Sequence, residues 1–364
     1  MKKLFLSFLF LSLTFCQVTK SATTKYDSFK PGQLWMDNNG VHINAHGGGI
    51  LFNESNKTYY WYGEHKVEGG RGNSAQVGVH CYSSNDLYNW KDEGIALKVS
   101  EDPQSDITIG SVIERPKVIY NAKTKKYVMW FHLELKGQGY AAARTATAVS
   151  DTPTGPFTFV ESFRPNAGKY PVNVDGMPTD SVRDRFFLRD FKGGQMARDM
   201  QLFVDDDGKA YHIASSEENY TMMISLLTDD YLRPSGTFAR ILVMHQYEGP
   251  ALFKKDGKYY FFGSGCTGWA PNPGHSAVAD HIFGPWKEFG NFAIGEKANT
   301  TFESQSTYVL PVQGKKDAFI YFGDRWTPKN AIDGRYIWLP IQWEDGRPVI
   351  HWSDEWNLNL FNKK

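Results

Sequence analysis

The stretch that decides the fold reads Tyr247-Glu248-Gly249-Pro250-Ala251-Leu252-Phe253-Lys254-Lys255-Asp256-Gly257-Lys258-Tyr259-Tyr260-Phe261-Phe262. An apolar segment at 251–253 and an aromatic segment at 259–262 flank Asp256-Gly257, which is the strongest short signal for a β-hairpin. The sequence therefore predicts two antiparallel strands joined by a tight turn. It places the carboxylate of Glu248 just before the first strand.

The same hairpin recurs four more times in the 364 residues. These copies span residues 49–62, 116–132, 200–213 and 307–322, with turns at Asn56-Lys57, Ala122 to Lys125, Asp206 to Gly208 and Gln313-Gly314. A second hairpin with an acidic turn before an aromatic residue follows each copy, in a looser form after the fifth. Five units of four strands predict an all-β, five-bladed β-propeller, whose radial closure leaves only short strand edges exposed.

The mature chain is predicted to form one catalytic domain over residues 33–356, because no Gly/Ser-rich linker divides it. Residues 164–190 interrupt the repeat between the second and third units. Long loops in compact domains are often functional, so this insertion is predicted to form part of a pocket wall. A surface loop is the alternative.

The N-terminus resembles an export signal, with Lys2-Lys3 followed by an apolar run at 4–15 that is too short to span a bilayer. We assign residues 1–22 to a signal peptide. Leu13-Thr14-Phe15-Cys16 resembles a bacterial lipoprotein cleavage box, except for the bulky Phe15, so a lipid anchor at Cys16 stays open. The expected location is periplasmic or lipid-anchored at the bacterial cell surface. The remaining Cys81 and Cys266 are expected to be free thiols.

Charge and composition favour a neutral partner. The chain has 40 basic and 40 acidic residues, so no net field attracts nucleic acid or an anionic membrane. We expect a monomer that acts on an oligo- or polysaccharide.

One polar residue stands at the same register before the first strand of every unit. The five residues are His46, Glu114, Asp199, Glu248 and Gln305. The innermost strands of a propeller line its central channel, so these side chains are predicted to share one pocket. Clustered carboxylates repel one another and lose hydration unless a substrate, cation or proton compensates, and paired carboxylates are what glycosidic bond cleavage requires. A polar plug without catalytic function is the alternative.

Further substrate contacts are predicted near the same strand ends. Aromatic rings offer flat faces to a sugar, and the predicted ones are Trp61, Tyr62, Trp130, Trp269 and Trp326. The residues predicted to bond hydroxyl groups are His65, Arg115, Arg198, Asp324 and Arg325, together with His46. Aromatic residues of β-rich proteins also fill cores, so a core position is the alternative for each ring.

The sequence resembles glycoside hydrolase family 43 over residues 33–356. The motifs that carry the resemblance are Ala45-His46-Gly47-Gly48-Gly49-Ile50, Tyr59-Tyr60-Trp61-Tyr62-Gly63-Glu64, Glu114-Arg115-Pro116-Lys117-Val118, Arg198-Asp199-Met200, Asp206-Asp207-Gly208-Lys209, Glu248-Gly249-Pro250, Ser264-Gly265-Cys266-Thr267-Gly268-Trp269 and Ser304-Gln305-Ser306. The resemblance implies a five-bladed, inverting enzyme. Glu248 matches the family's general acid, and Asp199 matches the carboxylate that tunes and orients that acid.

The sequence departs from the family pattern in blade one, where Asn44-Ala45-His46 replaces the expected Asp base. This pattern is similar to the branch of exo-β-1,3-galactanases, which lack that base and carry a pocket glutamine. The resemblance therefore implies release of galactose from galactan or arabinogalactan side chains. It assigns water positioning to Gln305 and sugar hydroxyl binding, or a substitute base, to Glu114.

Several alternatives stay open at this point. Within the family these are an α-L-arabinofuranosidase or a β-xylosidase, and outside it a non-catalytic carbohydrate-binding propeller or a retaining transferase or phosphorylase. No cofactor is expected to be required. The resemblance leaves room for a structural Ca²⁺ in the channel near His46, and the alternative for this side chain is a hydrogen bond or a substrate contact.

Overall fold

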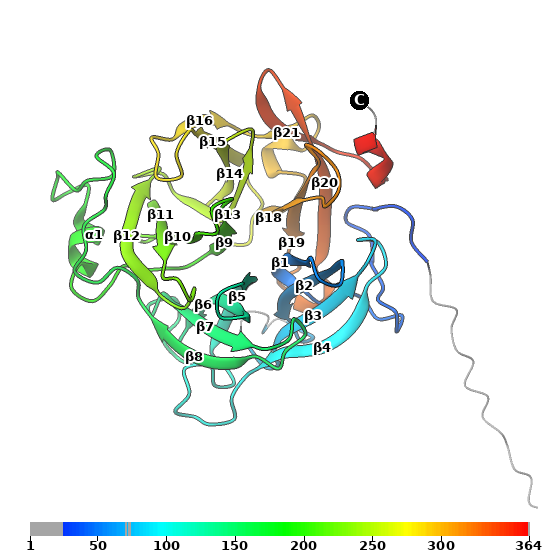
Figure 1. The fold of residues 1–364 in the computed structure, drawn as a ribbon, viewed down its shortest axis with the longest axis horizontal. Coiled ribbons are helices and arrows are strands. Elements are labelled where there is room, and N and C mark those ends of the chain that lie inside the picture. Colours follow the sequence, from blue (N-terminus) through cyan, green and yellow to red (C-terminus); the bar gives the residue numbers. More distant parts are fainter. Residues whose placement is uncertain (1–24, 70, 72–73, 363–364) are drawn as a thin grey trace, which may run out of the picture.

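A computed structural model describes residues 25–69, 71 and 74–362. Five antiparallel sheets surround a central axis like the blades of a propeller (Figure 1), which confirms the predicted all-β, five-bladed fold. The predicted signal peptide, residues 1–22, and Cys16 lie outside the described residues. Within the described ranges, no helix has the length and apolar character needed to cross a membrane.

The strands follow one another outward from the axis in each blade. Blade one contains β1 (His46–Asn53), β2 (Thr58–His65), β3 (Gly78–Ser84) and β4 (Lys91–Lys98). Blade two contains β5 (Val112–Asn121), β6 (Lys126–Glu134), β7 (Arg144–Ser150) and β8 (Thr158–Phe163). Blade three contains β9 (Met200–Val204), β10 (Ala210–Ser216), β11 (Thr221–Leu227) and β12 (Pro234–Ile241).

The last two blades continue the pattern. Blade four contains β13 (Tyr247–Lys255), β14 (Lys258–Gly265), β15 (Gly274–Ala279) and β16 (Lys287–Gly290). Blade five contains β18 (Gln305–Pro311), β19 (Phe319–Arg325), β20 (Arg335–Glu344) and β21 (Arg347–His351). The short strand β17 (Ala293–Ile294) pairs in parallel with β21 and extends this sheet. Three 3₁₀ turns complete the described elements, at Ala298–Thr300, Ala331–Asp333 and Leu358–Asn362.

The inner ends of the first strands are bulged, which the sequence does not reveal. The sequence places Glu248 before its strand, but Glu248 lies within β13 opposite Ser264, and the register shifts before Ala251. Similar shifts follow His46, Glu114 and Gln305, whereas Asp199 directly precedes β9. A bulge bends the strand and redirects its side chains, which places these polar groups over the channel.

The bulge in blade four depends on Gly249. Its φ of 58° is left-handed, and a Cβ atom there would lie 2.3 Å from the carbonyl oxygen of Ser306. Glycine alone combines this backbone conformation with so close an approach. The Glu248-Gly249 pair is therefore a structural unit that brings the acid next to blade five.

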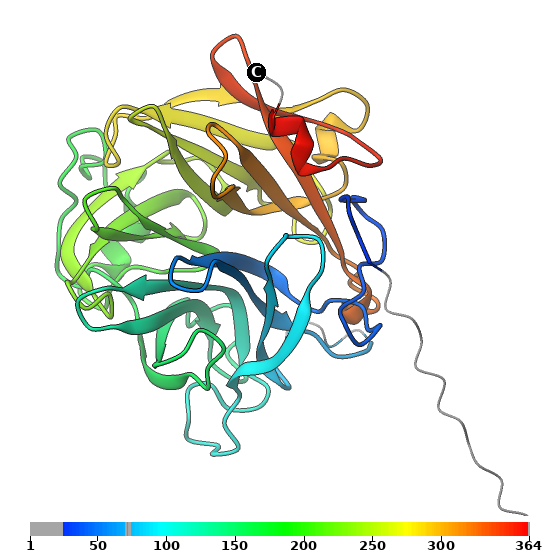
Figure 2. The ribbon, with the colours of Figure 1, turned by 45° about the vertical axis from the view of Figure 1, so that its right-hand side comes forward.

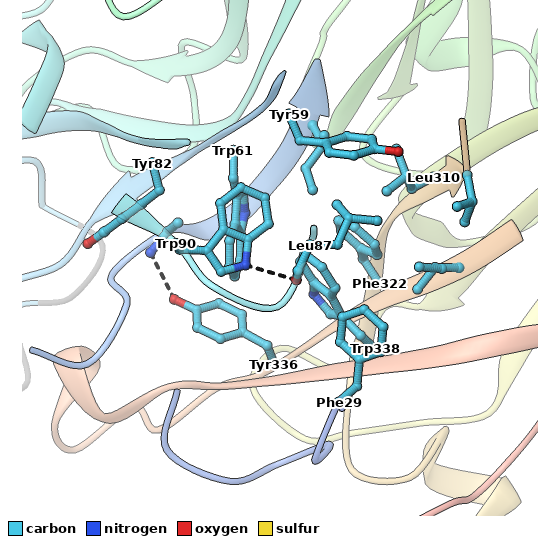
Figure 3. Packing of buried hydrophobic residues seen from close by; sticks show 14 of the residues in the cluster. Phe29, Tyr59, Trp61, Tyr82, Leu87, Trp90, Leu310, Phe322, Tyr336 and Trp338 are labelled. Atoms are coloured by element: carbon cyan, nitrogen blue, oxygen red, sulfur yellow. Dashed lines mark hydrogen bonds between the residues drawn. The ribbon is translucent and has the colours of Figure 1, made fainter. Parts of the chain in front are cut away.

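An aromatic cluster closes the ring between the last blade and the first, which lie side by side in Figures 1 and 2. Trp61 of blade one packs against Tyr336 and Trp338 of blade five, with ring centroids 4.7 and 4.8 Å apart. Tyr336 lies in this cluster with Trp61 and Trp338 (Figure 3). Its hydroxyl accepts a hydrogen bond from the backbone N–H of Ala45 at 2.8 Å. Burial of these large rings supplies much of the driving force for closure.

The insertion at 164–190 lies on the outside of blade three. Its helix α1 (Arg185–Asp190) stands at the outer edge of the propeller beyond β12 (Figure 1), and Phe187 packs against Met223 and Phe238. None of residues 164–190, all of which the structure describes, lines the central pocket. The prediction of a pocket wall is therefore wrong, because the apolar residues of the insertion anchor it to the blade's outer strands.

Candidate active site

The inner strand ends surround a central pocket of about 280 Å³. Its lining residues come from all five blades and are Glu64, Glu114, Arg115, His132, Tyr140, Arg198, Asp199, Asn219, Glu248, Gly268, Trp269, Gln305 and Trp326. Four of the five residues predicted to converge are present here, and His46 is the exception. A concave pocket with a few converging polar groups is the usual form of a small-ligand site.

Glu248 and Asp199 lie at the centre of this pocket. Asp199 accepts a hydrogen bond from the backbone N–H of Gly249 at 2.9 Å, which holds it beside the acid. Burial raises the pKa of Glu248 to about 7, and the negative charge of Asp199 acts in the same direction. With this pKa, about half of the Glu248 carboxyl groups carry a proton at pH 7, and the protonated form can act as a general acid.

Arg115 connects the carboxylate of Asp199 to the amide of Gln305. Its Nη2 atom donates to Asp199 Oδ2 at 2.8 Å and to Gln305 Oε1 at 2.5 Å. The residue is buried and has a left-handed φ of 55°, a strained conformation that its surroundings must hold in place. Glu64 provides part of that support by accepting the Arg115 backbone N–H at 2.9 Å.

The amide of Gln305 has a defined orientation. Its oxygen accepts hydrogen bonds from Arg115 and from the Trp326 indole at 3.3 Å, so the nitrogen must point the other way. That nitrogen donates to Ser264 at 3.0 Å and to Glu248 at 3.3 Å. Gln305 therefore contacts the acid directly, and its predicted role in positioning water stays a prediction.

Glu114 belongs to a buried chain of charged groups in blade two. The ring of His132 donates to Glu114 at 3.0 Å and to Glu134 at 2.9 Å, and the Tyr140 hydroxyl donates to Glu114 at 2.8 Å. Burial alone would raise the pKa of Glu114, but the hydrogen bond and positive charge of His132 hold it at about 2. Glu114 is therefore ionised and a weak base.

The sequence reasoning assigned no role to five pocket residues: Glu64, His132, Tyr140, Asn219 and Gly268. His132 had a usable signal, because it pairs with Glu114 across the first hairpin and alternates with Glu134 on the same strand. Asn219 and Tyr140 lie in connections, where no local pattern predicts their direction.

Asn219 reaches the acid through a strained turn. Its Nδ2 donates to Glu248 Oε1 at 2.7 Å, and residues 217–219 all have left-handed φ values, between 55° and 66°. The turn is anchored by Glu217, which accepts two hydrogen bonds from the buried guanidinium of Arg240. Asp184 of the insertion binds the same guanidinium at 2.9 Å. The insertion thus supports the pocket from behind through buried charges.

Several predicted sugar contacts are instead parts of the core. Trp61 is 2% exposed in the ring-closing cluster, and Tyr62 is fully buried with its hydroxyl bonded to the Pro153 carbonyl. Trp130 is also buried, and its indole donates to the Tyr231 carbonyl. His65 pairs with His80 away from the pocket. These predictions are wrong because the three aromatic residues lie on β2 and β6, the second strands of their blades, whose faces pack against neighbouring blades and leave only strand ends and loops for the ligand.

His46 lies beneath the pocket rather than in it. The side chain is fully buried and stacks against Trp326, with centroids 5.2 Å apart. Neither ring nitrogen has a hydrogen-bond partner among the residues that the structure describes, and burial lowers its pKa well below the usual value. The imidazole is therefore neutral and supports the pocket tryptophan, which corrects the prediction of a direct substrate contact.

Among the residues that the structure describes, no group of three metal-ligating side chains includes His46, near which the sequence leaves room for a Ca²⁺. Over the described ranges, the group with suitable spacing for a metal is Glu114, His132 and Asp199, whose ligand atoms lie within 4.8 Å of one another. Both nitrogens of His132 already bond carboxylates, so a cation there would have to displace existing partners. The Ca²⁺ assignment stays a prediction.

The remaining predicted contacts lie where a ligand can reach them. Arg115, Arg198, Trp269 and Trp326 line the central pocket, and Asp324 and Arg325 line a neighbouring hollow. Trp269 and Trp326 meet at 5.8 Å in an edge-to-face arrangement between the two spaces. Their roles in sugar binding stay predictions that this placement supports.

A five-bladed propeller whose pocket holds a protonated carboxyl beside a second carboxylate has the make-up of a glycoside hydrolase. Comparisons with known proteins agree. The family model for glycosyl hydrolases family 43 matches residues 184–348. A solved family 43 β-1,3-galactosidase with galactodeoxynojirimycin is 51% identical, with a TM-score of 0.85, and the match covers 91% of this chain and 100% of that one.

Two further relatives are more distant. A solved exo-β-1,3-galactanase from Phanerochaete chrysosporium, with β-1,3-galactotriose, is 33% identical with a TM-score of 0.78, over 92% of this chain and 69% of that one. A curated β-D-galactofuranosidase from Aspergillus niger is 26% identical over 253 residues, 65% of this chain and 66% of its own length. The chain belongs to glycosyl hydrolase family 43, and the resemblance seen in the sequence is confirmed.

Proposed function

We propose that the protein hydrolyses terminal galactose from β-1,3-linked galactan or arabinogalactan side chains, with inversion at the anomeric carbon. The observation that carries the proposal is Glu248, a carboxyl with a pKa of about 7 that lies beside Asp199 in a sugar-sized pocket. The choice of galactose is supported by the solved β-1,3-galactosidase and exo-β-1,3-galactanase relatives. We further propose export from the cytoplasm, which the N-terminal segment 1–22 supports.

In this mechanism Glu248 donates its proton to the glycosidic oxygen as the bond to the anomeric carbon breaks. A water molecule attacks the anomeric carbon from the opposite face and passes a proton to a solvent water molecule, so galactose leaves with inverted configuration and Glu248 regains its proton from solvent. Asp199 keeps the acid protonated beforehand, and Asn219 fixes the direction of its carboxyl group. Gln305 is the proposed water-positioning group, because ionised Glu114 is too weak a base and suits sugar hydroxyls better.

Rival functions find less support. A non-catalytic carbohydrate-binding propeller has no use for a carboxyl whose pKa is raised to about 7 by burial and a neighbouring charge. Arabinofuranosidase and xylosidase activities are not favoured by the solved relatives, which act on β-1,3-galactosides.

The activity is expected to decrease as pH rises through about 7, because only protonated Glu248 can donate. Above that pH, kcat/KM should fall about tenfold per pH unit. Replacing Asp199 with Asn removes a negative charge that raises this pKa, so the decrease should move to lower pH. Measuring kcat/KM between pH 4 and 9 for both proteins checks this, and an unchanged profile in the variant would contradict the role of Asp199.

A substrate panel tests the proposed function. The purified protein is incubated with β-1,3-galactobiose, an α-L-arabinofuranoside and a β-xyloside, and the released sugar is identified by chromatography. We expect galactose, initially as the α-anomer by NMR. Release of arabinose or xylose without galactose would overturn the substrate assignment, and an initial β-anomer would overturn inversion.

A further inference from the structure

A groove leads outward from the active-site pocket along the boundary between blades four and five. The pocket shares Trp269, Gln305 and Trp326 with a second hollow of about 320 Å³. The second hollow shares Glu303 and Arg325 with a third hollow of about 450 Å³. Because neighbouring hollows have common wall residues, the three adjoin one another in a row, and this row is called the groove. The groove ends at Trp352, just after β21, on the sheet that lies beside blade four in Figure 1.

The outermost hollow has the chemistry of a carbohydrate site. Its lining residues are Ile294, Gly295, Glu296, Lys297, Phe302, Glu303, Arg325, His351 and Trp352. Trp352 is 38% exposed and lines this hollow, so part of its ring is open to a ligand. Its indole N–H donates to Asp354 at 2.8 Å and its ring lies 5.7 Å from Phe302, so the ring has a fixed position. A fixed aromatic face with polar neighbours suits a sugar ring.

Arg325 stands where the second and third hollows meet. Its Nη2 atom donates to the Phe302 carbonyl at 2.8 Å, and its guanidinium lies 6.0 Å from the Trp352 ring. Its buried Nε atom has no hydrogen-bond partner within the part of the chain that the structure covers. The Arg325 side chain is 29% exposed and lines both hollows, so it can contact a ligand in the groove.

The backbone that forms the wall is held in an unusual conformation. Thr301, Phe302 and Glu303 have consecutive left-handed φ values of 47°, 57° and 62°. Residues other than glycine rarely adopt this conformation, and a β-branched threonine does so at a cost. The Thr301 hydroxyl donates to the Asn272 carbonyl at 2.8 Å and helps to maintain the turn. The turn brings both Phe302 and Glu303 to the groove.

The outermost hollow has balanced charges, with Glu296 and Glu303 opposing Lys297 and Arg325 in its lining. Lys297 lies 2.9 Å from Glu303, and His351 lies 2.7 Å from Glu344. A groove without a surplus of one charge does not select an ionic ligand, whereas a neutral polymer of hydroxyl groups fits its mixture of aromatic and polar side chains. Because the hollows adjoin the active site, the chain of the enzyme's own substrate is the polymer that can reach them.

We infer that the groove binds the rest of the galactan chain, and that Trp352 and Arg325 form a distal sugar subsite outside the catalytic pocket. The inference rests on the proposed function, because the polymer is the substrate named there. Such a distal subsite makes the enzyme more efficient on long galactan chains than on disaccharides.

Replacing Trp352 with Ala tests the distal subsite. The measured quantity is kcat/KM for β-1,3-galactan divided by kcat/KM for β-1,3-galactobiose. We expect this ratio to fall about tenfold, mainly through KM for the polymer, as is common when an aromatic anchor is truncated. Tyr120→Ala is the matched control, because Tyr120 is 43% exposed and lines none of the three hollows. An unchanged ratio in the Trp352 variant would overturn the subsite.

Direct binding separates this inference from the proposed function. Calorimetry measures the affinity of β-1,3-galactohexaose for two inactive proteins. The first carries Glu248→Gln alone, and the second carries both Glu248→Gln and Trp352→Ala. We expect the second protein to bind about tenfold more weakly, and equal affinities would overturn the subsite alone. If the unaltered protein releases no galactose from β-1,3-galactan or from β-1,3-galactobiose, the proposed function is wrong. In that case the galactan chain is also wrong as the ligand of the groove.

Discussion

Replacing Glu248 with Gln is expected to lower kcat on β-1,3-galactobiose by between about 10² and 10⁴, the usual contribution of a general acid. Glutamine preserves the shape of the side chain but has no acidic proton to give to the glycosidic oxygen. The hydrogen bond from Asn219 can persist, because the amide oxygen of glutamine accepts it as the carboxyl oxygen does at 2.7 Å. Initial rates of galactose release measure the effect.

A change of leaving group makes this experiment specific. The dinitrophenolate leaving group of a dinitrophenyl β-galactoside departs without protonation. The Glu248→Gln protein should therefore lose far less activity on this substrate than on galactobiose. Glu54→Gln is the matched control, because Glu54 lies in an exposed turn and pairs only with Lys57. Near-normal hydrolysis of galactobiose by the Glu248→Gln protein would show that Glu248 is not the general acid. Equal losses of activity on both substrates would indicate a defect other than lost proton donation.

Replacing Gln305 with Ala is expected to lower kcat by about 10² or more, because the water molecule loses the group that positions it. The same change removes the partner that links Arg115, Trp326 and Glu248. The fold should persist, since the side chain is partly buried at a strand end. Thermal unfolding checks the fold, and Gln313→Ala in an exposed turn is the control.

Azide distinguishes water positioning from a structural defect. Azide is a nucleophile that needs no base, so it can attack the anomeric carbon while Glu248 protonates the departing oxygen. Added azide should therefore restore turnover of the Gln305→Ala protein and give an α-galactosyl azide. If azide rescues Glu114→Gln and does not rescue Gln305→Ala, Glu114 is the base. Substrate binding must then raise the low pKa of the Glu114 carboxyl.

The propeller could be predicted from the sequence because its signals are local and repeated. A turn signal such as Asp256-Gly257 is contained within about four residues. Strands with alternating apolar and polar residues pair with the strands next to them in the chain. Lining up the repeats also placed Glu114, Asp199, Glu248 and Gln305 in one pocket, since equivalent strand ends must meet around the axis. His46 occupies the equivalent place but points into the packing beneath Trp326.

Aromatic residues show where sequence reasoning stopped. Trp61 lies within an aromatic-rich strand, and Trp326 comes directly after another. Trp61 is nevertheless in the core, whereas Trp326 is in the pocket. A strand pattern tells which residues share a face, but in a propeller both faces are covered by adjacent blades. Whether a ring meets protein or ligand then depends on how the blades pack.

The sequence by itself determined the fold and the polar residues at the inner strand ends, because both follow from a repeated local pattern, and the resemblance to family 43 singled out Glu248 and Asp199 as the proposed acid pair. Only the tertiary structure decided how that pair is controlled. The pKa of Glu248 depends on burial and on Asp199, and its orientation depends on Asn219, held through Arg240 by the insertion. These groups come from distant parts of the chain, and interactions between charges are set by distances that only the folded chain defines.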